Sequence, residues 1–201
     1  MQIAIIGWGS LLWDLEVLEP HVVPEWQRAA GPSLPLEFSR VSPKRLRALA
    51  LIIDPDHGTE CQTSLVNSRR DRLEDTVSDL AARERAPLDR IGFASKNGAW
   101  QSTIPGIEGN VGTWLISSGY DGAVWTDLPA NFRDETGAQF SIHRAISYLK
   151  TLNGNALLEA KRYIELAPEE SMTALRQALG EDPWWKDVPL KPDWDADGNA
   201  A

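Results

Sequence analysis

The sequence predicts an α+β domain in which a mixed β-sheet or small β-barrel is flanked by helices. Over roughly the first two thirds of the chain, short apolar runs alternate with glycines and prolines, a pattern typical of strands joined by turns. The last third contains three amphipathic stripes with helical spacing. Strands first and helices last indicate the α+β class. We expect one domain over residues 1–180, followed by a tail at 181–201 that is rich in Trp, Pro and Asp.

The early strands follow from apolar runs and turn residues. Residues 3–6 are an apolar run that ends at a pair of glycines, and residues 20–43 hold five prolines, which disfavour helix. A turn at 54–58 separates two further apolar runs, which we expect to pair as a hairpin. The expected strands are 3–6, 36–38, 48–53 and 60–66, and the first, third and fourth of these should share one sheet.

A long helix is expected over residues 69–85, lying against the sheet. Ser68, followed three residues later by Asp71, forms a candidate capping box, and Pro87 ends the helix. The apolar stripe of this helix consists of Leu73, Val77, Leu80 and Ala81.

Short strands and three more helices complete the expected fold. The strands, in a region that glycines and prolines break up, are 91–93, 112–117 and 123–125. The helical stripes are Ile142, Ala145, Ile146, Leu149 and Leu152; Leu157, Ala160, Ile164 and Ala167; and Met172, Leu175 and Leu179. We expect Trp184, Trp185 and Trp194 to hold the tail against the domain, and residues 195–201 to be disordered.

Charge and composition restrict the class of function. Twenty Lys and Arg against twenty-nine Asp and Glu give a net charge of −9, which argues against nucleic acids and anionic membranes as partners. Cys61 is the single cysteine, which fits a reducing compartment. No apolar stretch approaches the ~20 residues that span a bilayer, and the N-terminal run lacks the basic residues of a signal peptide. We therefore expect a soluble, cytoplasmic protein of unspecified oligomeric state.

The loop Gly7-Trp8-Gly9-Ser10-Leu11 is the first candidate binding site. Two glycines around one residue let the backbone turn sharply, so that several N–H groups can point at one carboxylate or phosphate, and the Ser10 hydroxyl adds a donor. The same spacing also fits a strand-ending turn whose glycines serve packing. On spacing alone this second interpretation is favoured, because short glycine motifs are common.

Glu84 is the candidate reactive group. It follows Leu73 by eleven residues, so at 3.6 residues per turn it falls within about 20° of the apolar stripe of the predicted helix. A carboxylate on an apolar face has to be paired, protonated or functional, because burying it alone is costly. Its neighbours Arg83 and Arg85 are expected to point elsewhere. The alternative is a glutamate at the helix end that has already reached solvent.

Other chemistries lack a complete set of residues. His57 and Cys61 form an incomplete zinc site, and the acidic turn at 54–60 places its glycine wrongly for a calcium loop. Ser10 does not stand in a G-x-S-x-G elbow, and the chain has no glycine motif for nucleotide phosphates. We therefore expect no metal site, no Ser-His-Asp hydrolase and no nucleotide cofactor.

The two candidate sites resemble motifs of one family. The segment Ile5-Ile6-Gly7-Trp8-Gly9-Ser10-Leu11-Leu12-Trp13 resembles the Tyr-Gly-Ser-Leu signature of γ-glutamylcyclotransferases, especially the Gly-Tyr-Gly-Ser-Leu-Ile-Trp form of the glutathione-degrading, ChaC-type branch. The segment Leu80-Ala81-Ala82-Arg83-Glu84 resembles the family segment that ends in Arg-Glu, and residues 160–164 resemble the closing helix. Trp8 stands where the family usually has Tyr, and residues 85–88 and 91–132 differ from that branch.

The resemblance implies a small mixed β-barrel flanked by helices, and a reaction. In the family, the α-amine of a γ-glutamyl group attacks its own γ-carbonyl, which gives 5-oxoproline and releases the attached amine. By resemblance, Glu84 is the acid/base, the Gly7–Leu11 loop binds the γ-glutamyl substrate, and no metal or organic cofactor is needed. The alternative is a binding or interaction module that keeps the pocket without turnover, which Trp8 and the Trp-rich tail favour.

Overall fold

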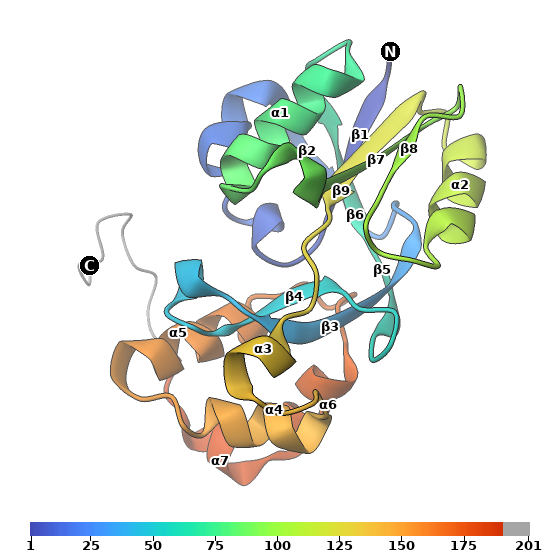
Figure 1. The fold of residues 1–201 in the computed structure, drawn as a ribbon. Helices are drawn as coiled ribbons and strands as arrows, with labels where there is room; N and C mark the ends of the chain where they lie inside the picture. Colours follow the sequence, from blue (N-terminus) through green and yellow to red (C-terminus); the bar gives the residue numbers. More distant parts are fainter. Residues whose placement is uncertain (191–201) are drawn as a thin grey trace.

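The computed structural model describes residues 1–190 and contains two β-sheets with helices packed around them (Figure 1). The larger sheet has six strands in the order β2-β6-β1-β9-β7-β8, and the smaller has three in the order β4-β3-β5. This confirms the predicted α+β class. The described strands do not close into a barrel, so the barrel alternative is wrong.

The six-stranded sheet is mixed and centres on β1. Its strands are β1 (Ile3–Gly7), β2 (Val22–Gln27), β6 (Ser64–Ser68), β7 (Ile91–Ser95), β8 (Trp100–Gln101) and β9 (Gly122–Thr126). Strand β1 runs antiparallel to β6 and parallel to β9. Because side chains alternate along a strand, Ile3 and Ile5 pack into one hydrophobic cluster and Ile6 into the other. Both faces of β1 are therefore buried.

The three-stranded sheet consists of β3 (Ser33–Val41), β4 (Leu49–Ile53) and β5 (Thr59–Gln62). Two expectations are wrong here. The runs on either side of the 54–58 turn do not pair with each other, because both pair with β3, which lies between them. Nor do residues 48–53 and 60–62 share a sheet with residues 3–6, whereas residues 64–66 do, because they pair with β1 as part of β6. The run 60–66 divides at Thr63, whose buried hydroxyl donates to the Pro32 carbonyl at 2.7 Å, so the chain passes from β5 into β6 of the larger sheet.

Helix α1 (Leu73–Glu84) covers one face of the larger sheet, as predicted. It begins four residues later than predicted, and Arg72 occupies the N-cap position without a side-chain cap. The predicted capping box is wrong: the Ser68 hydroxyl accepts from the Arg70 N–H at 3.1 Å, before the helix begins. The helix ends at Glu84, and the next residue, Arg85, is the C-cap and adopts a left-handed conformation with φ 54°.

The segment 112–117, predicted as a strand, lies in helix α2 (Glu108–Ser117). Val111 and Leu115 are buried four residues apart, whereas Ile116 is 78% exposed, so burial follows the helical and not the strand period. The strands predicted at 91–93 and 123–125 are confirmed as β7 and β9. Figure 1 shows α1 and α2 on opposite sides of the larger sheet.

The C-terminal helices gather around the smaller sheet (Figure 1). They are α3 (Phe132–Thr136), α4 (Ile142–Leu149), α5 (Gly154–Glu165), α6 (Ala174–Glu181) and α7 (Pro183–Asp187). The three predicted stripes correspond to α4, α5 and α6, although Met172 precedes α6 and is 51% exposed. Trp185 is buried in the core, and the Lys161 Nζ donates to its carbonyl at 2.9 Å. The expectations for Trp194 and residues 195–201 lie outside the described residues.

Short 3-10 helices complete the fold: η1 (Gly9–Leu12), η2 (Glu16–His21), η3 (Pro43–Arg45) and η4 (Leu88–Arg90). Three of them, η1, η3 and η4, contribute residues to the cavity described below. Within residues 1–190, every helix is too short or too polar to cross a lipid bilayer.

Candidate active site

A cavity of about 570 Å³ lies where the two sheets meet. Its wall combines the end of β1, the middle of β4, the C-terminal end of α1 and Tyr163 of α5. Cavities of roughly 300–1,000 Å³ are typical of small-molecule sites. Of the predicted site residues, the cavity is lined by Gly7, Trp8, Ser10, Leu11 and Glu84, whereas Gly9 is not among its lining residues. The prediction that the glycine loop and Glu84 share one pocket is therefore confirmed.

The loop after β1 is held against β4 by its tryptophan. The Trp8 indole N–H donates to the Leu51 carbonyl at 3.0 Å, and the Leu51 N–H donates to the Tyr163 hydroxyl at 3.4 Å. Gly9 has φ +54°, and a Cβ at this position would lie 2.9 Å from the Tyr163 hydroxyl. Gly9 therefore makes the turn possible by leaving room for Tyr163. The phenolic hydroxyl of the cavity comes from Tyr163, which sequence reasoning missed.

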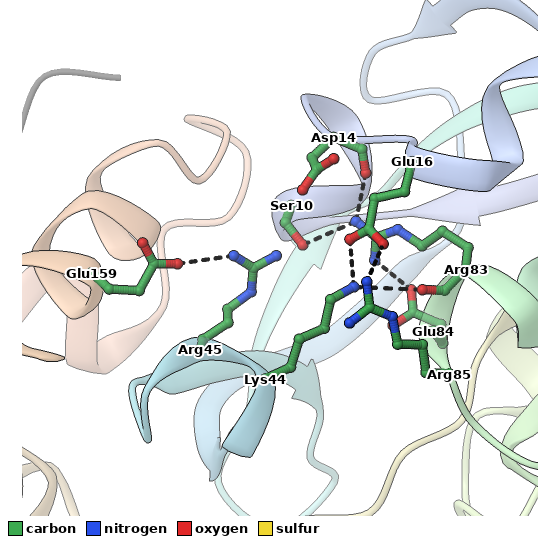
Figure 2. Close-up of polar contacts among 9 residues, drawn as sticks. All are labelled: Ser10, Asp14, Glu16, Lys44, Arg45, Arg83, Glu84, Arg85 and Glu159. Carbon is green, nitrogen blue, oxygen red and sulfur yellow. Dashed lines mark hydrogen bonds and ion pairs between the residues drawn. The ribbon is translucent and has the colours of Figure 1, made fainter. Parts of the chain in front are cut away.

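Arg83 connects the two predicted site elements (Figure 2). Its Nη1 donates to the Glu84 carboxylate at 2.6 Å, and its Nη2 donates to the Ser10 hydroxyl at 3.3 Å and to the Asp14 carbonyl at 2.6 Å. The Arg83 side chain is 3% exposed and that of Glu84 is 13% exposed. One buried guanidinium thus joins a loop and a helix end that lie 73 residues apart.

The expectation that Arg83 points away from Glu84 is wrong. Adjacent residues on a helix diverge at their Cβ atoms. Glu84, however, is the last residue of α1, and the long Arg83 side chain is buried beneath that helix end, where it reaches the neighbouring carboxylate. Glu84 is therefore paired. For a carboxylate on an apolar helix face, being paired was one of the three expected states, beside being protonated or functional.

A second ionic cluster lies beside the first (Figure 2). The Glu16 carboxylate accepts from the Lys44 ammonium and, at 3.2 Å, from Arg85. Burial alone would raise the pKa of Glu16, but the hydrogen bond and charge of Lys44, with the charges of Arg83 and Arg85, lower it overall. Arg45 pairs with Glu159 at 3.0 Å and stacks over the Tyr163 ring.

The basic wall of the cavity is a second feature that sequence reasoning missed. Its members come from two short stretches, residues 40–45 and 83–90, in which basic residues recur. Because the chain as a whole is acidic, the recurrence of basic residues in these two stretches is the sequence signal that could have indicated a basic site. Periodicity does not show that the two stretches face each other, because their meeting depends on the pairing of β3 with β4 and on where α1 ends.

The acidic turn at 54–60 is held by hydrogen bonds. Asp54 accepts from the backbone N–H groups of Asp56 and His57 at 3.1 and 3.2 Å, which is typical of a turn built on an Asp side chain. Within residues 1–190, no group of three or more His, Cys, Asp and Glu side chains is arranged to hold a metal ion. The absence of bound metal stays a prediction.

Cys61 is expected to react slowly with thiol reagents in the native protein. It is 3% exposed, and burial together with the charges of Glu37 and Glu60 raises the pKa of its thiol to about 11. A rise of two pKa units lowers the thiolate fraction near pH 8 roughly a hundredfold. Iodoacetamide labelling followed by intact mass should therefore be more than a hundredfold slower than in urea. Equal rates in the two conditions would contradict this prediction.

Comparison of the chain with protein-family models, curated proteins and solved structures finds no match. The resemblance to γ-glutamylcyclotransferases accordingly rests on the quoted residues.

Proposed function

We propose that this protein is a γ-glutamylcyclotransferase-like enzyme, which converts the γ-glutamyl group of a small amine or peptide into 5-oxoproline and releases the amine. The observation that carries the proposal is the buried Arg83 guanidinium, which joins Ser10 of the glycine loop to Glu84 inside one cavity. The loop and the carboxylate are the two elements that the proposed reaction needs.

The cavity suits an intramolecular attack. In the proposed reaction, the α-amine nitrogen forms a bond to the γ-carbonyl carbon, and the bond from that carbon to the amine nitrogen breaks. Because nucleophile and carbonyl belong to one glutamyl chain, holding that chain curled supplies much of the barrier reduction. Trp8 and Tyr163 form rigid walls for this purpose, since each is hydrogen-bonded to Leu51.

Glu84 is the proposed acid/base. Its carboxylate would take a proton from the α-ammonium and later give one to the departing amine. The Arg83 hydrogen bond to Oε1 fixes the orientation of the carboxylate. Within residues 1–190, Oε2 has no hydrogen-bond partner, which leaves it available to the substrate.

The Gly7–Leu11 loop is proposed to bind the substrate α-carboxylate or the oxyanion that develops at the γ-carbonyl. The Ser10 hydroxyl accepts from Arg83, so its own proton is free to be donated toward the cavity. The Trp8 indole N–H is already used by the Leu51 carbonyl, so this residue contributes shape and not a donor.

The proposal predicts release of 5-oxoproline. Purified protein should be incubated with a panel of γ-glutamyl amines, amino acids and peptides, and 5-oxoproline should be measured by mass spectrometry. At least one panel member should be cyclised in stoichiometric amounts with release of its amine. A folded protein that cyclises none of them would contradict the proposal.

The second candidate function is a binding module without turnover. The observation that favours it is the close ion pair between Glu84 and Arg83, which partly neutralises the carboxylate that would act as base. The same panel separates the two functions: a binding module would show saturable binding of a panel member, for example by calorimetry, with no 5-oxoproline formed.

A further inference from the structure

The cavity concentrates positive charge in an acidic protein. The chain carries a net charge of −9. The cavity wall nevertheless contains one acidic side chain, Glu84, and six basic ones: Arg40, Lys44, Arg45, Arg83, Arg85 and Arg90. A concave site lined by one sign of charge attracts ligands of the opposite sign.

Four of the six cations have carboxylate partners in the protein. Lys44 and Arg85 share Glu16. Arg45 pairs with Glu159, and Arg83 pairs with Glu84. These four positive charges are therefore at least partly balanced without a ligand.

Arg40 and Arg90 are different. Within residues 1–190, neither has a carboxylate oxygen within 4.0 Å. The Arg40 Nη1 donates to the Pro129 carbonyl at 2.6 Å, and the Arg90 guanidinium makes no hydrogen bond to any described residue. Both side chains are half-buried on the cavity wall.

Arg40 and Arg90 place like charges on the wall of one cavity. Burial lowers the pKa of Arg40, and the positive charge of Arg90 lowers it further. The negative charge of Glu135 acts in the opposite direction, but Glu135 is itself paired with Arg47. The N–H of the buried Asp127 donates to the Arg90 carbonyl, but its carboxylate forms no ion pair with either guanidinium and instead accepts from the side chains of Ser102, Thr103 and Trp125. Partly buried like charges without a directly paired carboxylate are unfavourable, and such positions cluster at functional sites.

We propose that Arg40 and Arg90 form an anion subsite of this cavity, which binds a carboxylate or phosphate group of the ligand. Guanidinium groups present paired N–H donors that match both oxyanions. The subsite adjoins the cavity-lining residues Leu128 and Pro129, whereas the Ser10–Arg83–Glu84 cluster adjoins Asp14. In the proposed cyclisation, the bound oxyanion belongs to the amine that is released. Only this last assignment rests on the proposed function.

Inorganic phosphate is the probe for the subsite itself. Wild type should bind phosphate saturably in calorimetry, and Arg90→Gln and Arg40→Gln should each weaken binding roughly ten- to hundredfold, as expected for loss of a hydrogen bond to a charged group. Arg90→Gln is the cleaner variant, because no described residue accepts a hydrogen bond from its guanidinium, and its melting temperature without phosphate should be unchanged or higher.

Two matched controls remove the same charge elsewhere. Arg85→Gln changes a cavity cation that already pairs with Glu16, and Arg28→Gln changes an exposed residue outside the cavity. The phosphate Kd of each control should lie within about threefold of the wild-type value. This change is much smaller than the one expected when a hydrogen bond to a charged group is lost. Absence of saturable phosphate binding, or equal weakening in Arg85→Gln and Arg90→Gln, would overturn the subsite.

A second experiment tests whether the anion that binds Arg40 and Arg90 belongs to the released amine of the substrate. Three γ-glutamyl amines that share one scaffold should be compared: one ending in an amide, one in a carboxylate and one in a phosphate ester. Wild type should show a lower KM for an anionic member, and Arg90→Gln should abolish that difference. If none releases 5-oxoproline, the proposed function fails while the phosphate titration still decides the subsite. If all turn over with equal KM, the assignment to the released amine is overturned.

Discussion

Glu84→Gln is expected to lower 5-oxoproline release by about 10²- to 10⁴-fold, the range typical of general acid–base catalysis, in a protein that still folds. Gln keeps the shape of Glu, and its carbonyl can still accept the Arg83 Nη1–H bond that measures 2.6 Å in the wild type. It cannot take up a proton. The substitution therefore removes proton transfer and keeps the packing of the helix end.

The stability change should be small and destabilising. The Arg83 guanidinium is 3% exposed, and in the variant it loses its carboxylate partner while keeping Ser10 and the Asp14 carbonyl. Weakening one charge-assisted hydrogen bond in this way costs roughly 1–2 kcal/mol. For a chain of this size, that lowers the melting temperature by about 2–4 °C per kcal/mol.

Glu16→Gln is the matched control. It also removes one carboxylate beside the cavity, one that is ion-paired with Lys44 and Arg85. We expect it to keep activity within about tenfold of wild type, since no proton transfer is assigned to it. A Glu84→Gln protein that melts near wild type and retains most activity would remove Glu84 from the catalytic role.

Local patterns predicted much of the fold. The apolar run at 3–6 marks β1, and the stripes at 142–152 and 157–167 mark α4 and α5. The division into two sheets could not be predicted in this way. It depends on the contact of Thr63 with Pro32, which is a tertiary interaction with no local signature. Helix α2 could not be predicted from local pattern because it contains Gly109 and Gly112, and glycine is more typical of breaks between short strands than of helix interiors.

The glycine loop and Glu84 could be predicted as site residues because each has a local sequence signal. Two glycines around Trp8 and a carboxylate in register with an apolar stripe are local signals, and the structure brings both to one cavity. The pairing of Arg83 with Ser10 is not local, and neither is the placement of Arg40 and Arg90 on the wall of one cavity. Charged side chains carry no periodic signal when they line a cavity from several elements, so their partners follow only from the tertiary structure.

Arg83→Met is expected to have the largest effect on stability. It replaces a buried side chain that donates to Glu84, Ser10 and the Asp14 carbonyl with an apolar chain of similar length. Glu84 would be left as a mostly buried, unpaired carboxylate. Removing one partner of a buried ion pair lowers the free energy of unfolding by about 3–5 kcal/mol. Because the Glu84 side chain is 13% exposed, we expect a loss near ~3 kcal/mol for Arg83→Met. Denaturant unfolding should show the loss, and activity should fall because the carboxylate is no longer oriented.

The double variant Arg83→Met with Glu84→Gln separates the structural role of this pair from the catalytic one. A neutral amide costs less to bury than an unpaired carboxylate, so the double variant should be more stable than Arg83→Met alone. The coupling free energy between the two sites should lie in the range of about 0.5–3 kcal/mol found for residues in contact. Stability would thus return in part while 5-oxoproline release would not, because the proton acceptor is gone. If the double variant recovered activity together with stability, Glu84 would act only as the counter-charge of Arg83, and the proton acceptor would have to be another group in the cavity.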